Sequence, residues 1–304
     1  MKNLYPELFD IGNTENWQKY LSVYGYVVIQ NILSRDTIIK YFKIFATEWK
    51  QVTPKFDFNN KETWIPENTP IMWNKGMVYW NGFGQSDFMW ALRTDKTILS
   101  IWENLHKTDK LVVSFDAFSV YLSNKQKSNS WLHVDQPNNC EIYSIQGAYN
   151  FLPVTESSAG FVVVPNSHKT YTCIPKSKTN FSQINKDDYH NELAVKLIIP
   201  SNCFVLWNSK TIHANVGISD KKLTHDFNRL TCYLSYFPKI LRNEKVFIQR
   251  LSGYKNKETC GHYAIKYNKK NHPYGLKKRY ESRNFNFIKD KNIDLIPEDI
   301  YNLI

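Results

Sequence analysis

His133 and Asp135 stand two positions apart in the segment SWLHVDQPNN, residues 130–139, which resembles the end of a strand. Alternate residues of a strand face the same side, about 6.5–7 Å apart, so this imidazole and this carboxylate can reach one point. Burying two such groups is costly unless each has a partner, such as the other group, water, a substrate or a metal ion. The pair is therefore a candidate site.

A third candidate group is His213, in the downstream segment FVLWNSKTIHANVG, residues 204–217. Two histidines and one carboxylate form the facial ligand set that leaves three positions of Fe(II) open. Ligands far apart in sequence are expected when different strands of a β barrel supply them. The H-x-D spacing alone also fits a hydrogen-bonded His–Asp pair or a general acid/base pair.

The segments before these groups predict helices around one short strand. Residues 15–50 predict helix, strand and helix, with the β-branched run GYVVIQN at 25–31 and Ser34 as the N-cap of the second helix. Residues 95–106 predict a further helix. Residues 51–90 lack clear periodicity, and we expect them to form a long ordered loop over a site.

From about residue 111 the chain becomes rich in short β runs broken by Pro, Gly and Asn, which predicts a β sandwich or barrel. After Pro238 it becomes basic and loop-rich. We therefore expect one catalytic domain over 1–304. Its parts are a helical N-terminal part with the pocket loop at 1–110, a β core at 111–238, and a C-terminal extension at 239–304 packed on the core.

The composition describes a globular protein, with 42% hydrophobic residues and a net charge of +11. The region 239–283 holds thirteen Lys and Arg against three Glu, so it carries most of the excess charge. Such a region can attract a nucleic acid, a phosphorylated substrate or an anionic surface. The simpler interpretation is a solvated basic face.

Targeting signals are not evident. No apolar run approaches the eighteen residues that span a bilayer, and the N-terminal MKNLYPELFDIGN lacks the apolar region of a secretory signal. The five cysteines are scattered and never form CxxC, which argues against a disulfide framework, a zinc ribbon or an iron–sulfur site. We expect a cytoplasmic protein with no membrane partner.

Several segments resemble one known family when they are taken in order. They are GYVVIQNILSRDTI, LHVDQ, AGFVVVPNSH, LWNSKTIHANVG and NRLTCYLSYFP. Together they resemble the phytanoyl-CoA dioxygenase-like family of Fe(II)/2-oxoglutarate-dependent oxygenases, over residues 20–238. The resemblance implies a mainly β fold with flanking helices, a double-stranded β-helix of the jelly-roll or cupin-like barrel type. It also implies Fe(II) bound by His133, Asp135 and His213 as the catalytic centre, with 2-oxoglutarate and O2 as cosubstrates.

The resemblance further assigns Arg229 to the distal carboxylate of 2-oxoglutarate. A guanidinium meets a carboxylate through two parallel hydrogen bonds and keeps its charge at any working pH. Thr231 faces the same way as Arg229 and can add a hydroxyl donor. Tyr121 and Gln146, on neighbouring predicted strands, are candidate contacts of 2-oxoglutarate, although a place in the core or behind the contacting residues is the commoner role of such side chains.

The substrate pocket is expected to involve Trp131 and Gln136 beside the metal ligands, and Trp80 and Arg93 from the region 64–93. Arg93 is a candidate partner for an anionic substrate, although a structural salt bridge is the commoner role of such an arginine.

The implied reaction oxidatively decarboxylates 2-oxoglutarate to succinate and CO2 and oxidises a substrate C–H bond. The presence of Asp135 favours hydroxylation over halogenation, while epimerisation, desaturation and ring closure use the same ligands. We expect a small organic substrate. The alternatives are a protein that binds an anionic partner or a nucleic acid on an oxygenase fold, and an oxygenase that acts on a nucleic acid or a protein.

Overall fold

The computed structural model describes residues 2–72, 76–122, 131–137, 139–172, 182–218, 227–270, 288 and 296–304. The chain forms two compact units. The first unit combines 1–32 with 120–231, and the second combines 33–119 with 232–304. These boundaries differ from the divisions expected at 110 and 238, because the N-terminal and C-terminal segments each join residues far away in sequence. The interpretation of the whole chain as a single domain stays a prediction.

The first unit contains a six-stranded sheet, which holds both candidate histidine ligands. Its order is β1 (Lys2–Leu4), β11 (Val195–Leu197), β9 (Gly160–Val163), β13 (His213–Val216), β7 (His133–Val134) and β10 (Ser182–Gln183). Strands β1 and β11 are parallel, and the other neighbours are antiparallel. In this register His213 lies opposite His133.

A second sheet of the first unit runs in the order β2 (Leu8–Asp10), β3 (Tyr26–Gln30), β12 (Cys203–Asn208) and β8 (Ile145–Asn150). It continues with β14 (Arg229–Tyr233) and β6 (Phe118–Tyr121), two strands that both run on into the second unit. Antiparallel pairing of β8 with β12 sets Gln146 opposite Trp207. The two sheets do not join into a closed barrel among the described strands.

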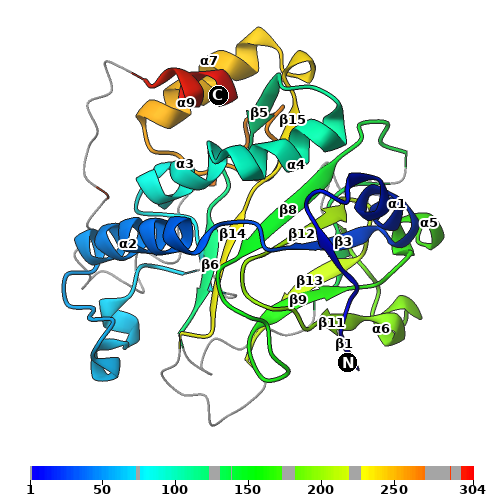
Figure 1. Ribbon diagram of the computed structural model, residues 1–304, viewed down its shortest axis with the longest axis horizontal. Helices are drawn as coiled ribbons and strands as arrows, with labels where there is room; N and C mark the ends of the chain where they lie inside the picture. Colours follow the sequence, from blue (N-terminus) through cyan, green and yellow to red (C-terminus); the bar gives the residue numbers. More distant parts are fainter. Residues whose placement is uncertain are drawn as a thin grey trace. The chain divides into compact units, whose positions relative to one another are not determined.

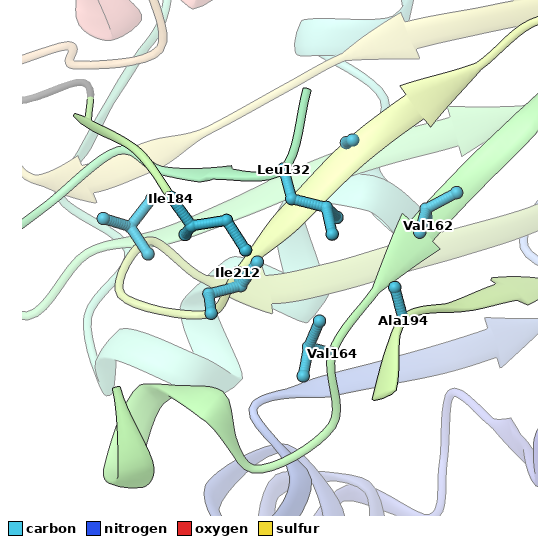
Figure 2. Packing of buried hydrophobic residues seen from close by; sticks show 8 residues of the cluster. Leu132, Val162, Val164, Ile184, Ala194 and Ile212 are labelled. Carbon is cyan, nitrogen blue, oxygen red and sulfur yellow. The ribbon is translucent and has the colours of Figure 1, made fainter. Parts of the chain in front are cut away.

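Eight apolar side chains pack on one face of the six-stranded sheet (Figure 2). Alternate residues of a strand face opposite sides, so the neighbours of His133 and His213 in sequence turn away from these two imidazoles. Those neighbours belong to the cluster, which therefore supports the sheet from the face opposite the candidate ligands. The cluster consists of Leu132, Val134, Val162, Val164, Ile184, Ala194, Ile212 and Ala214.

The described helices of the first unit are α1 (Thr14–Tyr24), α5 (Ser167–Thr170) and α6 (His190–Leu193). Helix α1 ends at Gly25, which has a left-handed φ of 79°. A Cβ atom there would lie 2.4 Å from His168 Nδ1 and 2.5 Å from Thr211 Oγ1, so the position requires glycine. The Nε2 atom of His168 donates to the carbonyl of Ser22 (3.1 Å), which ties the PNSH turn to the end of α1.

The second unit is richer in helix. It contains α2 (Arg35–Val52), α3 (Asp87–Arg93), α4 (Lys96–His106), α7 (Glu244–Lys255) and α9 (Glu298–Leu303), together with short 3-10 turns at Lys61–Thr63, Pro66–Asn68, Phe83–Gln85 and Lys239–Leu241. Strand β5 (Leu111–Val113) pairs with β15 (Tyr236–Pro238), and β4 (Met77–Val78) pairs with the first residues of β6. Helices α7 and α9 lie side by side (Figure 1), with Phe247 against Tyr301. Ser34 caps α2 as predicted, because its hydroxyl accepts from the backbone N–H of Thr37.

Two helices lie where the sequence predicted loops. Helix α3 begins at Asp87, inside the stretch 51–90, and runs to Arg93. Its seven residues are too few to show the 3.6-residue spacing of apolar side chains that predicts a helix. Helix α7 occupies the basic region, and the only fully buried residues among its twelve are Arg250, Gly253 and Tyr254. It therefore lacks the apolar stripe by which a helix is recognised. Among the described helices, none combines the length and the apolar character needed to cross a membrane.

Candidate metal centre

The three candidate ligands of the first unit converge at one buried point. Strand β7 carries His133, the turn after it carries Asp135, and β13 carries His213. The Nε2 atom of His213 lies 3.2 Å from Oδ2 of Asp135, and the Nε2 atom of His133 lies 3.7 Å from Oδ1. One potential ligand atom from each residue lies within 4.8 Å of the other two. The structure thus brings together the triad expected from the sequence.

Backbone carbonyls orient both imidazoles of this triad. The Nδ1 atom of His133 donates to the Trp131 carbonyl and that of His213 donates to the Thr211 carbonyl, both at 2.9 Å. A neutral imidazole that donates from Nδ1 presents a lone pair at Nε2. Two lone pairs and a carboxylate then face one another, and a divalent cation would offset their mutual repulsion. The donor set therefore fits a metal ion.

Aromatic rings enclose the two imidazoles. Trp131 stacks on His133, with ring centres 4.1 Å apart and an interplanar angle of 17°. Phe161 and Trp207 pack against His213, with ring centres 5.8 Å and 5.3 Å away. The Trp131 Nε1 atom also donates to the Asn215 carbonyl (3.2 Å). These contacts restrict the rotation of both imidazoles and limit the access of water.

Asp135 is held by groups from the second sheet and from the turn after β12. Its backbone N–H donates to the Ser209 carbonyl (3.0 Å). The amide nitrogen of Gln146 donates to Asp135 Oδ2 (2.8 Å) and to Ser209 Oγ (3.2 Å), and the hydroxyls of Ser144 and Ser209 lie 2.7 Å apart. Gln146, expected to contact 2-oxoglutarate, therefore directs one N–H group to the candidate ligand Asp135 and the other to Ser209.

Arg229 is buried on β14, and three hydrogen bonds to the protein hold its guanidinium. Nε donates to Thr231 Oγ1 (2.8 Å), Nη1 to the Gly160 carbonyl (3.2 Å) and Nη2 to Asn215 Oδ1 (2.9 Å). Thr231 in turn donates to Asn150 Oδ1 (2.8 Å). Of the five guanidinium N–H groups, one on each terminal nitrogen has no partner among the described residues.

Two further groups of the first unit belong to the surroundings of Arg229. The ring of Tyr121 lies 5.9 Å from Arg229 Cζ. Lys196 is buried on β11, where its ammonium donates to the carbonyls of Glu156 and Ser158. Burial is the main cause that lowers the pKa of Lys196 to about 8, and the positive charge of Arg229 is the second cause. This end of the unit therefore holds two buried cations, which favours an anionic ligand.

Asn215 is a residue of this site that sequence reasoning missed. It lies two positions after His213 on β13 and faces the same side, so it connects the ligand strand with the guanidinium of Arg229. The H-x-N spacing in HANVG was the available signal. Lys196 offered no comparable signal, because a lone lysine in a strand is usually exposed.

Gln136 is buried beside Asp135 in sequence. Its amide nitrogen donates to the Ile142 carbonyl (2.7 Å) and lies 2.9 Å from Cys140 Sγ. These contacts occupy its N–H groups within its own loop. The part that Gln136 plays in binding a substrate stays a prediction.

Trp80 and Arg93 belong to the second unit and are both buried. Arg93 donates from Nη1 to the Gly84 carbonyl (2.7 Å) and from Nη2 to the Asp116 carbonyl (2.6 Å), and burial lowers its pKa to about 10. These contacts give Arg93 a role in packing its own unit. Contact of Trp80 or Arg93 with a substrate stays a prediction.

The basic stretch 239–283 also lies in the second unit, and its residues 271–283 are outside the described part of the chain. A role of this stretch in binding nucleic acid stays a prediction.

No protein-family model matches the chain, so the resemblance to the phytanoyl-CoA dioxygenase-like family stays a prediction. The chain is 24% identical over 252 residues to Ava biosynthesis cluster protein O of Aspergillus versicolor, a match that covers 76% of this chain and 80% of that protein.

Two solved structures share the arrangement of the elements. The epimerase SnoN, in complex with Fe3+, alpha ketoglutarate and nogalamycin RO, has a TM-score of 0.51 and 14% identity, over 74% of this chain and 84% of its own. The non-heme alpha ketoglutarate dependent carbocyclase SnoK from nogalamycin biosynthesis has a TM-score of 0.50 and 12% identity, over 76% and 87%. The chain thus has the mainly β jelly-roll fold of the cupin type, with flanking helices, that these iron- and 2-oxoglutarate-dependent enzymes share.

Proposed function

We propose that the protein is a non-haem Fe(II)- and 2-oxoglutarate-dependent oxygenase that hydroxylates a small organic substrate and releases succinate and CO2. The observation that carries this proposal is the pairing of two features in one unit. Two imidazole lone pairs converge with the Asp135 carboxylate, and a buried arginine on the neighbouring sheet keeps an N–H group on each terminal nitrogen for a ligand.

The metal ligands in this proposal are His133, Asp135 and His213. Two histidines and a carboxylate suit Fe(II) and leave positions for other ligands. When bound, the iron supplies the redox chemistry that activates O2. The residues supply orientation: the carbonyls of Trp131 and Thr211 fix the tautomer of each imidazole, and Ser209 and Gln146 hold Asp135.

The cosubstrate contact in this proposal is Arg229. Its two remaining N–H groups suit the two oxygens of a carboxylate, and a buried carboxylate needs such a paired cation. The hydroxyl hydrogen of Thr231 goes to Asn150, while its oxygen accepts from Arg229. Thr231 would therefore act on 2-oxoglutarate by orienting Arg229. Asn215 would do the same from the strand that carries His213.

The reaction type is inferred from the ligand set. Asp135 occupies the position that a halide needs in a halogenase, so oxidation of a C–H bond is favoured over halogenation. SnoN is an epimerase and SnoK a carbocyclase on the same fold, so epimerisation and ring closure are the competing outcomes. Both act in nogalamycin biosynthesis, and the similar Aspergillus versicolor protein is named for a biosynthesis cluster, which supports a small-molecule substrate.

A two-step assay tests the proposal. Purified protein is titrated with Fe(II) without oxygen, and succinate is then measured after 2-oxoglutarate and air are added. The double variant His133→Ala/His213→Ala should bind no Fe(II) at the concentrations that saturate the wild type. His190→Ala is the matched control, because His190 is another buried histidine that contacts an aspartate in the same unit, with Asp188 at 2.6 Å.

Wild-type affinity for Fe(II) in the double variant would refute the ligand assignment. Iron binding without any binding of 2-oxoglutarate would favour the alternative of a binding protein on an oxygenase fold.

A further inference from the structure

We propose that Gln146 is a positioning residue that makes Asp135 bind the metal through one oxygen atom and so keeps three coordination positions open. This inference rests on the proposed function, because it concerns the same metal centre. It assigns to Gln146 a role that differs from the expected contact with 2-oxoglutarate.

The geometry places Gln146 where it controls the carboxylate. Gln146 is 5% exposed, and its side chain reaches from β8 to the turn after β7. Nε2 lies 2.8 Å from Asp135 Oδ2, a normal length for a hydrogen bond to an ionised carboxylate. The same nitrogen lies 3.2 Å from Oγ of Ser209. The backbone carbonyl of Ser209 accepts a hydrogen bond from the backbone N–H of Asp135. Gln146 and Ser209 therefore clamp Asp135 at its side chain and its backbone.

The hydrogen-bonding capacity of Gln146 explains why this residue type is needed. Its amide nitrogen has two hydrogens, one for Asp135 and one for Ser209, and its remaining polar atom is an acceptor. An acceptor alone does not bind a carboxylate of a cosubstrate. A donor is what Asp135 requires, since a glutamate at this position would set two carboxylates against each other.

The consequence concerns how Asp135 can meet a metal ion. Oδ1 lies 3.7 Å from the Nε2 atom of His133, while Oδ2 lies between His213 and Gln146. A carboxylate that binds a metal through both oxygens must turn them equally toward the ion. The hydrogen bond from β8 opposes this rotation. Without it, Asp135 loses the contact that opposes this rotation, and its second oxygen can fill one of the positions that the cosubstrates need.

The test uses Mn(II) alone as the probe and counts its water ligands. Wild type, Gln146→Met and Gln146→Asn are loaded with Mn(II), and the water ligands are counted by electron paramagnetic resonance in isotopically labelled water. Methionine keeps the size of the side chain without its N–H groups, and asparagine keeps the amide but shortens its reach. Gln85→Met is the matched control, because Gln85 is a buried glutamine with two hydrogen bonds in the second unit.

We expect about three water ligands in the wild type and in Gln85→Met. An octahedral ion has six positions, and three side chains that each bind through one atom leave three positions for water. We expect about two in both Gln146 variants. Three waters in a folded Gln146 variant, or two in the wild type, would overturn the role of Gln146 and leave the metal centre intact. Failure of the wild type to bind Mn(II) at all would instead overturn the proposed function, and this inference with it.

Discussion

Replacing Arg229 by alanine tests the assignment of the cosubstrate pocket. The guanidinium makes three hydrogen bonds to the protein, to Thr231, Gly160 and Asn215, and keeps one N–H on each terminal nitrogen for a ligand. The Arg229→Ala variant removes both of these N–H groups and the buried charge. A carboxylate entering the same pocket then loses its hydration without gaining a partner.

The magnitude follows from this geometry. Losing one partner of a buried, hydrogen-bonded charge pair costs about 2–5 kcal/mol, which corresponds to a roughly 30-fold to several thousand-fold weaker binding of 2-oxoglutarate. Arg229→Lys should recover only part of this loss, because one ammonium cannot form two parallel hydrogen bonds. Thr231→Val removes the acceptor of Nε but keeps the charge, so it should cost about 1 kcal/mol, or roughly fivefold.

Calorimetry without oxygen, on protein saturated with Mn(II), measures these affinities. Each variant is titrated with 2-oxoglutarate and with 2-oxopentanoate, which has the same chain length and lacks the distal carboxylate. The wild type should prefer 2-oxoglutarate strongly, and Arg229→Ala should bind both acids equally weakly. Mn(II) affinity should be unchanged in all variants, because Arg229 is not a ligand.

The comparison of the two acids decides the matter. If Arg229→Ala still prefers 2-oxoglutarate as strongly as the wild type does, another cation binds the distal carboxylate and the reasoning fails. Lys196 would be the first candidate, as a buried ammonium whose pKa the charge of Arg229 helps to lower.

Three further predictions follow from other features. Asp135→Gly should lower succinate formation by orders of magnitude with little change in the melting temperature of the metal-free protein, since the residue lies in a turn and the neighbouring strand contacts are untouched; near-normal turnover would refute the ligand assignment. Gly160→Ala should cost about 1–3 kcal/mol in a denaturant titration, because its Cβ would lie 2.6 Å from Val154 Cγ1 and 2.8 Å from Lys196 Cε; an unchanged midpoint would contradict this. Burial lowers the pKa of His106, so its contribution to stability is complete above its ordinary pKa of about 6.5 and is lost as the pH falls through the lowered value. The loss of melting temperature on acidification should therefore be smaller in His106→Phe, and an equal loss would exclude this histidine as a source.

Local signals predicted a large part of this structure. The alternation of His133 and Asp135 depends on one strand, and the capping of α2 by Ser34 depends on four consecutive residues. Such features need no knowledge of distant contacts. Helix α7 was missed although it is equally local, because its buried positions include an arginine and a glycine in place of an apolar stripe.

Contacts between distant segments were not predictable in the same way. The hydrogen bond from Gln146 to Asp135 depends on how β8 lies beside the turn that follows β7, and the sequence carries no mark of that placement. The same holds for Asn215, which meets Arg229 across two sheets. The joining of 33–119 with 232–304 in one unit likewise depends on contacts between residues more than a hundred positions apart.

The pairing of β13 with β7 would link metal binding to the folding of the sheet. His213 lies directly opposite His133, and its neighbours Ile212 and Ala214 belong to the apolar cluster on the other face. A slip of β13 by one residue would bury an imidazole among aliphatic side chains and leave the centre with two ligands. An ion that needs all three ligands would therefore stabilise only the correctly aligned sheet. The stabilisation would be about 2.7 kcal/mol when the free ion is at a hundred times its dissociation constant. A bound ion would thus favour the correct strand alignment, and a chain that folds with the ion present would populate the misaligned sheet less.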